Sequence, residues 1–304
     1  MNKFILNLFV LKVLKIFLLL AFVFSPFVEK EEQDWESIFN GVDLENWIIK
    51  FANQELNFNY KNTFKVENKM IRIVYDEYKK FENSYAHLYY KKPYSYYKLR
   101  FDYRFLGDQV KDGASWNIRN SGVMVHSQSP ESNDFGQFFP VSIEMQLLGG
   151  LGRGKRTTGN ICTPGTAVEI DNKINYKHCI DSNSKTYNGD QWVSAEIIVH
   201  GGERIIHIIQ NDTVLTYEKP QIGGGFANPH LGNKDWSSNG IESKDYWLSK
   251  EGEVLNSGYI AFQAESHSID FKNIKLLNLC GCMDSRAKNF KSYYIKPNNS
   301  SCIY

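Results

Sequence analysis

Two neighbouring stretches of this chain alternate apolar and polar side chains in a way that could place reactive groups on one surface. Residues 141–147 put Ser142, Glu144 and Gln146 on the same side of a predicted strand. A carboxyl group beside an amide can serve acid–base chemistry, with Glu144 as the base. The same pattern is also typical of an ordinary solvated strand face. Both interpretations stay open from these residues alone.

The predicted strand over residues 121–126 should lie beside the Glu144 strand, and together with Asn120 just before it should bring two more polar groups there. Asn120 can donate and accept hydrogen bonds, and His126 could act as an acid or a metal ligand. The alternative for His126 is a histidine at a strand end that makes one backbone hydrogen bond.

A third polar row is predicted near the end of the main domain. Gln263, Glu265 and His267 alternate along residues 258–267 and should point the same way. Glu265 and His267 could hold a divalent cation together with Glu144, because carboxylate and imidazole suit zinc or a related metal. No HExxH spacing supports that cation, and no other cofactor is predicted.

The loop that follows the Glu144 strand is rich in glycine and in basic side chains. It contains Arg153, Lys155 and Arg156, but it lacks the GxxxxGK[ST] pattern of a phosphate cradle. We therefore predict a flexible loop at the site, with Arg156 binding substrate. Trp236, like two other tryptophans of the long loops, could stack on a sugar or anchor its loop.

These residues need a scaffold, and the rest of the chain predicts one made of strands. Short alternating segments recur between residues 59 and 276, and no convincing amphipathic helix appears. Residues 204–210 and 214–218 predict a hairpin. Connections at residues 106–118, 149–190 and 219–256 are predicted as long loops. The pattern predicts an all-β sandwich of two antiparallel sheets.

The amino-terminal residues predict export. Lys3, Lys12 and Lys15 precede or interrupt an apolar run that is continuous over residues 16–24, so residues 1–28 are expected to be a signal peptide or an uncleaved signal anchor. The protein is then periplasmic, extracellular or on the cell surface. The formal charge is +1, or about −2 without those three lysines, and no nucleic-acid partner is predicted.

Five cysteines in an exported chain favour disulfides over metal thiolates. Cys162 and Cys179 flank an insert and are predicted to pair. Of the three cysteines near the carboxyl end, we expect Cys282 to pair with Cys302, which leaves Cys280 free or paired elsewhere.

Four segments, in their order along the chain, resemble the DUF1080 family, also called the 3-keto-disaccharide hydrolase domain. They are FNGVDLENW at residues 39–47, NSG at 120–122, IEMQ at 143–146, and the closing stretch at 262–274. The resemblance covers residues 36–279 and implies a concanavalin A-like jelly roll. Glu144 and Gln146 match the family's YEVQ-like motif, whereas Glu265 stands where many relatives carry a histidine.

The last 25 residues, 280–304, resemble a short GCTDPxAxNY…DDGSCxY module found at the ends of exported bacterial proteins. Ser285 replaces its proline, and the acidic DDG becomes residues 298–300. The resemblance implies a small disulfide-closed cap or surface-attachment element rather than a cation site.

The family resemblance implies an oxidised glycoside as substrate. A ketone at C3 acidifies the proton at C2, so a base can start elimination of the glycosidic oxygen, after which water adds back; direct hydrolysis is the other route. Glu144, His126 and His267 are the predicted catalytic residues. Two other functions remain open, a carbohydrate-binding module without catalysis and a structural surface protein. The residues predicted to bind substrate are Asn120, Gln146, Gln263, Glu265, Arg156 and Trp236.

Overall fold

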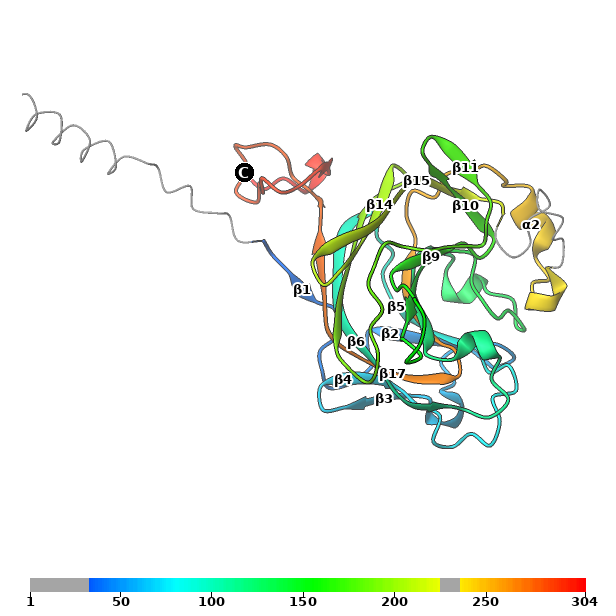
Figure 1. Ribbon diagram of the computed structural model, residues 1–304. Helices are drawn as coiled ribbons and strands as arrows, with labels where there is room; N and C mark the ends of the chain where they lie inside the picture. Colours follow the sequence, from blue (N-terminus) through cyan, green and yellow to red (C-terminus); the bar gives the residue numbers. More distant parts are fainter. Residues whose placement is uncertain (1–32, 225–235) are drawn as a thin grey trace, which may run out of the picture. The chain divides into compact units, whose positions relative to one another are not determined.

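The computed structural model describes residues 33–224 and 236–304, and these residues form an all-β domain (Figure 1). The predicted export segment, residues 1–28, lies outside the described residues. Among the described residues, none belongs to a helix long and apolar enough to span a lipid bilayer. The short helices are η1 (Tyr60–Asn62), η2 (Ser115–Asn117), η3 (Pro130–Ser132), η6 (Ser237–Asn239), α2 (Lys244–Leu248) and η7 (Asn299–Ser301).

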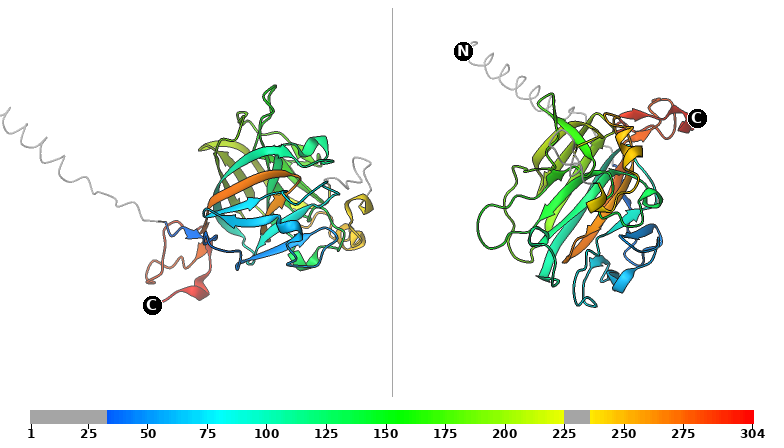
Figure 2. Two further views of the ribbon diagram at one scale, coloured as in Figure 1. Left: turned by 90° about the horizontal axis from the view of Figure 1, so that it is seen from below. Right: turned by 90° about the vertical axis from the view of Figure 1, so that its right-hand side faces the viewer.

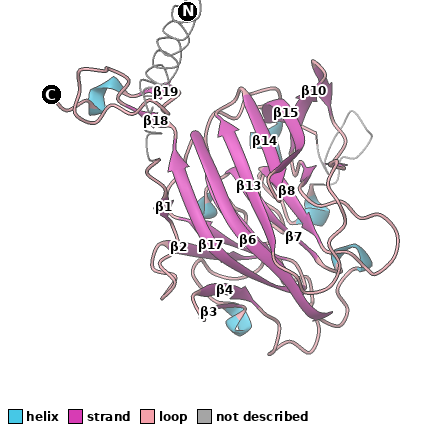
Figure 3. Cartoon of the chain, turned by 60° about the vertical axis from the view of Figure 1, so that its left-hand side comes forward, coloured by secondary structure: helices cyan, strands magenta, loops and turns pink. Residues whose placement is uncertain are grey.

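Two large antiparallel sheets make up the domain, as the alternating sequence pattern predicted. Figure 3 shows β17, β6, β13 and β14 side by side, with β7 and β8 of the other sheet behind them. The larger sheet contains, in spatial order, β11 (Lys173–Asn175), β10 (Thr166–Ile170), β15 (Asp212–Ile222), β14 (Arg204–Ile209), β13 (Val193–His200), β6 (Tyr96–Gln109), β17 (His267–Asn278), β4 (Met70–Ile73) and β3 (Phe64–Glu67), and β1 (Glu36–Ser37) also pairs with β17. The smaller sheet contains β12 (Cys179–Ile180), β9 (Asn160–Cys162), β8 (Ile143–Leu148), β7 (Asn120–Ser127), β16 (Tyr259–Ala264), β5 (Ala86–Tyr90) and β2 (Trp47–Phe51).

The core lies between the two sheets and fixes which side chains face away from it. Ile143, Met145 and Leu147 of β8 are fully buried in the core. Phe101 of the larger sheet meets Phe262 of the smaller sheet edge to face, with ring centroids 5.7 Å apart. Burial of each such side chain contributes about 1.5–3 kcal/mol. Because side chains alternate along a strand, this packing turns Glu144 to the other face of the smaller sheet.

The predicted hairpin is present as β14 and β15, with its turn one residue earlier than the sequence indicated. Gln210 and Asn211 form the turn, and both have positive φ angles, 51° and 69°. Two left-handed residues in a row are the geometry of a type I′ turn, which matches the twist of paired strands.

The prediction of one long loop over residues 149–190 was wrong in its extent. This region contains β9, β10, β11 and β12, which extend the edges of both sheets. Each of these strands has two to five residues. So few residues give little alternation in sequence, and their pairing depends on partners that are distant along the chain.

Both predicted disulfides are present, Cys162–Cys179 and Cys282–Cys302, and Cys280 is free. The carboxyl-terminal residues, drawn in orange to red in Figure 2, form a small element around the second disulfide. Its two strands, β18 (Cys280–Gly281) and β19 (Lys296–Pro297), pair in parallel.

Candidate active site

A cavity of about 670 Å³ lies on the face of the smaller sheet that is turned away from the core. Strands β7, β8 and β9 contribute to its floor, and the loops before β7, between β7 and β8, and after β8 and β9 contribute to its walls. A volume of this size suits a ligand of one or two sugar rings. The lining residues are Ser115, Trp116, Asn120, Phe139, Glu144, Gln146, Leu148, Leu151, Arg156, Cys162, Pro164, His178, Cys179, Asn239 and Glu265.

Glu144 occupies the middle of the floor because a glycine on the next strand leaves room for it. Met124 is the direct cross-strand partner of Glu144, and Gly122 lies two residues away on the same face. A β-carbon at Gly122 would lie 2.1 Å from Oε1 of Glu144 and 2.6 Å from its Cγ. The carboxyl group therefore lies across β7, where no other residue type would admit it.

Glu265 enters the cavity from the turn that joins the two sheets. β16 ends at Ala264 in the smaller sheet, and β17 begins at His267 in the larger sheet. Ser266 makes the turn with a φ of 77°, and its backbone N–H donates to the Tyr75 hydroxyl at 2.8 Å. The turn thus holds the Glu265 carboxyl at a fixed place beside the floor.

The two carboxyl groups share an environment that disfavours their charged forms. Burial raises the pKa of Glu144 to about 8. Burial also raises the pKa of Glu265 well above its ordinary value, and the negative charge of Glu144 raises it further. Arg156 opposes that rise through its positive charge. The pair therefore holds at least one proton at neutral pH, which is the condition for one group to act as an acid and the other as a base.

Amide side chains surround the pair. Gln146 Oε1 accepts a hydrogen bond from Asn160 Nδ2 at 3.1 Å, which fixes its orientation. Asn120 Nδ2 donates to the Trp116 carbonyl at 3.2 Å, while the buried Oδ1 of Asn120 has no protein partner. A buried acceptor without a partner is costly unless a ligand or water binds it. Asn120 and Gln146 are therefore placed to hold a polar ligand.

Arg156 lies in the cavity wall, as the glycine-rich loop suggested. Its Nη1 donates to the Gly149 carbonyl at 2.6 Å, and its backbone N–H donates to the Thr186 hydroxyl at 2.8 Å. These bonds fix the guanidinium at the site and leave it further donors for a ligand.

Gln263 belongs to β16, two residues before Glu265, but does not line the cavity. Its side chain is fully buried, and neither amide atom has a hydrogen-bond partner in the protein. It lies across from His87 of β5, whose buried Nε2 is also without a partner. Gln263 is therefore buried next to the site and is not one of the residues that line the cavity.

The structure does not bring His126 to the carboxyl pair. Its backbone has a φ of 49°, next to an irregularity in the pairing of β7 with β16, so the alternation that predicted its direction ends there. Nε2 contacts the Gly201 carbonyl at 2.9 Å, and the ring is buried. This position corresponds to the alternative interpretation, a histidine bonded to the backbone near a strand end.

His267 also lies outside the cavity. The predicted continuous strand is interrupted at Ser266, so His267 starts the larger sheet and no longer follows Gln263 and Glu265 in direction. Its ring packs edge to face against Phe105 at 5.8 Å. Burial and the charge of Arg119 lower the pKa of His267 to about 4, so the imidazole is neutral at physiological pH.

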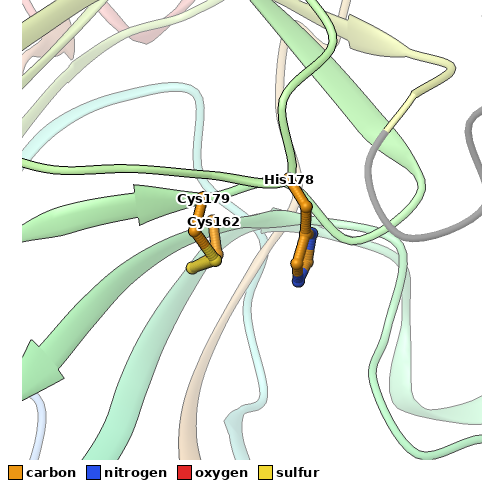
Figure 4. Close-up of side chains that lie close together, drawn as sticks. All are labelled: Cys162, His178 and Cys179. Carbon is orange, nitrogen blue, oxygen red and sulfur yellow. A yellow bond between two sulfur atoms is a disulfide. The ribbon is translucent and has the colours of Figure 1, made fainter. Parts of the chain in front are cut away.

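A metal site does not form from the residues predicted for it. Among the described residues, the one group of three close metal-ligating side chains is Cys162, His178 and Cys179 (Figure 4). The two sulfur atoms of that group are joined in a disulfide, which removes the thiolates a metal would need. Glu144, Glu265 and His267 form no such group, so we derive no catalytic step through a cation.

Trp116, and not Trp236, lies where a tryptophan could stack on a sugar in the cavity. Trp236 is only 4% exposed and packs with Val141, Ile222 and Ile241, which corresponds to loop anchoring. Trp116 is 53% exposed and lines the cavity.

Other parts of the site were not predicted from the sequence. Gly122 gives Glu144 its space, and Leu151 and the Cys162–Cys179 disulfide line the wall. Only Gly122 had a usable signal, because a glycine two residues after Asn120 in a predicted central strand indicates a close approach by another group.

Removal of the Cys162–Cys179 disulfide tests its role in the cavity wall. Cys162 is the cross-strand partner of Glu144, and the bridge holds the edge strand β12. Its sequence separation is 17, so replacing both cysteines by serine should lower the free energy of unfolding by about 3 kcal/mol and raise KM. Thermal melts and steady-state kinetics measure both effects.

The Cys282–Cys302 disulfide supplies a matched control with a sequence separation of 20. Its removal should leave KM unchanged, because neither cysteine lines the cavity. Equal changes of KM in the two double variants would contradict a specific role for the bridge in the wall.

Taken together, two packed antiparallel sheets and a concave site with a buried carboxyl pair define a jelly-roll domain with a candidate catalytic site. The family model described as the 3-keto-alpha-glucoside-1,2-lyase-like domain matches residues 34–277. The chain belongs to that family.

Solved structures of similar architecture were also found. A candidate glycosyl hydrolase from Parabacteroides distasonis ATCC 8503 has 20% identity and a TM-score of 0.47, with 80% of this chain and 98% of that chain covered. A protein of unknown function with a galectin-like fold from Bacillus subtilis has 9% identity and a TM-score of 0.45, with coverage of 80% and 94%. A LamA variant from Zobellia galactanivorans, in complex with laminaritriose and laminaritetraose, has 10% identity and a TM-score of 0.45, with coverage of 80% and 97%. No protein with curated function matches the chain.

Proposed function

We propose that this domain cleaves glycosides oxidised at C3 by proton abstraction at C2, elimination of the glycosidic oxygen and addition of water. The observation that carries the proposal is the pair of buried carboxyl groups, Glu144 and Glu265, in one cavity with raised pKa values. Such a pair supplies a base and an acid at once. Membership of the lyase-like family supports an oxidised glycoside as the substrate class.

Glu144 is the base in this mechanism. Its pKa of about 8 is near the pH at which proton transfer is most effective, and the charge on ionised Glu144 raises the pKa of Glu265, so the two groups do not ionise together. The Glu144 carboxylate takes the C2 proton, and the C–H electron pair passes to the C3 oxygen as an enolate. When that pair returns, it forms the C1–C2 double bond as the C1–O bond breaks.

Glu265 is the acid. It keeps its proton while Glu144 is charged, and it delivers that proton to the departing glycosidic oxygen. Water then adds across the double bond, with hydroxyl to C1 and hydrogen to C2. Ordinary glycosidases also use two carboxyl groups, but around an oxocarbenium ion rather than an enolate.

The enolate oxygen at C3 needs hydrogen-bond donors while the negative charge is on it. Arg156 offers the remaining guanidinium N–H groups, and its charge acts on the Glu265 side of the cavity. Asn120 and Gln146 are placed to bind the sugar hydroxyls. These three groups are fixed by their own hydrogen bonds, so little reorganisation accompanies the reaction.

The pH dependence follows from the state of the base. Activity requires ionised Glu144, so kcat/KM should rise about tenfold per pH unit below pH 8 and level off above it. A further fall at higher pH should appear as Glu265 loses its proton. A pH–rate profile of kcat/KM measures both limbs, and a profile that is flat from pH 5 to 9 would contradict Glu144 as the base.

Release of free sugar from a 3-keto-glucoside by the purified full chain tests the proposal, with the unoxidised glucoside as comparison. We expect turnover of the oxidised substrate alone, because only the ketone acidifies the C2 proton. Equal turnover of the two would indicate ordinary hydrolysis. Saturable glycan binding without turnover of either would favour the carbohydrate-binding function.

A further inference from the structure

Two of the side chains that line the cavity are apolar and exposed to solvent, and they mark its mouth. Trp116 is 53% exposed and Leu151 is 46% exposed, and both line the cavity that holds Glu144 and Glu265. Of the strongly exposed large apolar side chains in the described residues, these two alone line it. Single exposed apolar residues are common on proteins, but apolar groups gathered at a concave site indicate a ligand.

Trp116 is held in place before any ligand binds. Its ring is nearly parallel to that of Tyr85, at 8° and 6.3 Å between centroids. The Tyr85 hydroxyl accepts a hydrogen bond from Asn117 at 3.1 Å, and Asn120 bonds the Trp116 carbonyl. The indole is therefore a fixed flat surface whose position is tied to the cavity floor.

Leu151 is fixed from both sides although it lies at a loop tip. The Gly150 N–H donates to the Tyr187 carbonyl at 2.7 Å, and the Gly152 N–H donates to Asn188 Oδ1 at 3.0 Å. The loop therefore holds Leu151 at the cavity, where its side chain stays exposed to solvent.

Most of the lining of the cavity is apolar. The carboxyl pair and the amides offer hydrogen bonds on the floor, where an oxidised sugar needs them. The side chains of Leu151, Phe139, Leu148 and Pro164 offer no hydrogen bond, and Trp116 offers only its indole N–H. A second sugar ring would require more polar partners than this for its hydroxyl groups, whereas a flat aromatic group would not.

We propose that the mouth of the cavity is a subsite for an aromatic leaving group, so that the substrates are 3-keto-glycosides of phenols or similar aromatic alcohols rather than 3-keto-disaccharides. This inference rests on the proposed function. The aromatic ring stacks on Trp116 and contacts Leu151 while the oxidised sugar occupies the floor.

Kinetics on two substrates test the subsite. A phenyl 3-keto-glucoside should have a kcat/KM at least about tenfold above that of a 3-keto-disaccharide with the same linkage, since one aromatic contact of this kind is worth about that factor. Trp116→Ala and Leu151→Ser should each lower kcat/KM for the phenyl 3-keto-glucoside about tenfold. The same substitutions should lower kcat/KM for the 3-keto-disaccharide much less. Trp116→Phe should restore most of the aryl preference.

Ile174→Ser is the matched control for Leu151→Ser, because Ile174 is 43% exposed and lies away from the cavity. Ile174→Ser should leave kcat/KM unchanged for both substrates. Equal losses on the two substrates in Trp116→Ala, or a preference for the disaccharide in the parent, would overturn the subsite and keep the proposed function.

Calorimetric binding of unoxidised phenyl glucoside separates the subsite from the reaction. Binding that weakens in Trp116→Ala, with no turnover of any 3-keto substrate, would overturn the proposed function and support the subsite. No binding of phenyl glucoside, with turnover of the disaccharide, would overturn the subsite.

Discussion

Replacing Glu144 by glutamine should reduce kcat by a factor of about 10²–10⁴ and make the protein more stable. The activity falls because the amide cannot take the C2 proton, although it keeps nearly the same shape and the same place over Gly122. The two effects have one cause, because burial raises the pKa of the carboxyl group and also makes its ionised form destabilising.

The sign of the stability change follows from the two pKa values. Glu144 ionises near pH 4.5 in the unfolded chain and near pH 8 in the folded protein. As pH rises from 4.5 to 8, the unfolded state loses this proton while the folded state keeps it, so the folded state is progressively disfavoured. At pH 7 the raised pKa lowers the free energy of unfolding by about 3 kcal/mol, and Glu144→Gln removes this loss.

Chemical denaturation at pH 5 and pH 8 measures the stability effect. The gain from Glu144→Gln should be small at pH 5 and should grow toward pH 8. Glu45→Gln, an exposed substitution outside the cavity, should change neither activity nor stability. A variant that is inactive but less stable than the parent at pH 8 would argue against a buried, strained carboxyl group at this position.

Gly122→Ala should also remove most of the activity, although it changes no reactive group. The new β-carbon would lie 2.1 Å from Oε1 and 2.7 Å from Cδ of Glu144, so the side chain must rotate away. A displacement of about 1 Å can cost 10²-fold, and we expect at least that loss in kcat/KM. Because the flexible carboxyl group can move, the fold should survive with a cost of about 1–3 kcal/mol.

A double-variant cycle gives the control for this prediction. If Gly122→Ala acts through Glu144, it should cause little further loss of activity in the Glu144→Gln background. Independent losses that multiply in the double variant would show that the alanine disturbs something else, such as the strand itself.

The sequence allowed the sandwich and the main carboxyl group to be predicted because both depend on local alternation. In β8 the apolar residues at 143, 145 and 147 face the core, and Glu144 and Gln146 must then face outward. The disulfides could also be predicted, because each joins two cysteines that lie close together along the chain, with sequence separations of 17 and 20.

The histidines could not be placed, because alternation fails where the backbone turns left-handed. His126 has a positive φ itself, and Ser266 has one just before His267. Each of these residues redirects the side chains that follow. Neither of them is a glycine, so the sequence does not indicate a left-handed backbone there. The apolar mouth depends on loops that meet only in three dimensions, so no pattern in sequence pointed to Leu151.

The source of the hydrogen at C2 is the most direct test of the proposed chemistry. When a 3-keto-glucoside is turned over in D₂O, elimination followed by hydration should place deuterium at C2 of the released sugar as the proton taken by Glu144 exchanges with solvent, and a substrate deuterated at C2 should react several-fold more slowly. We expect both results, measured by NMR after correction for exchange without enzyme. Released sugar that keeps its original C2 hydrogen, with no isotope effect, would contradict Glu144 as the base that starts the reaction.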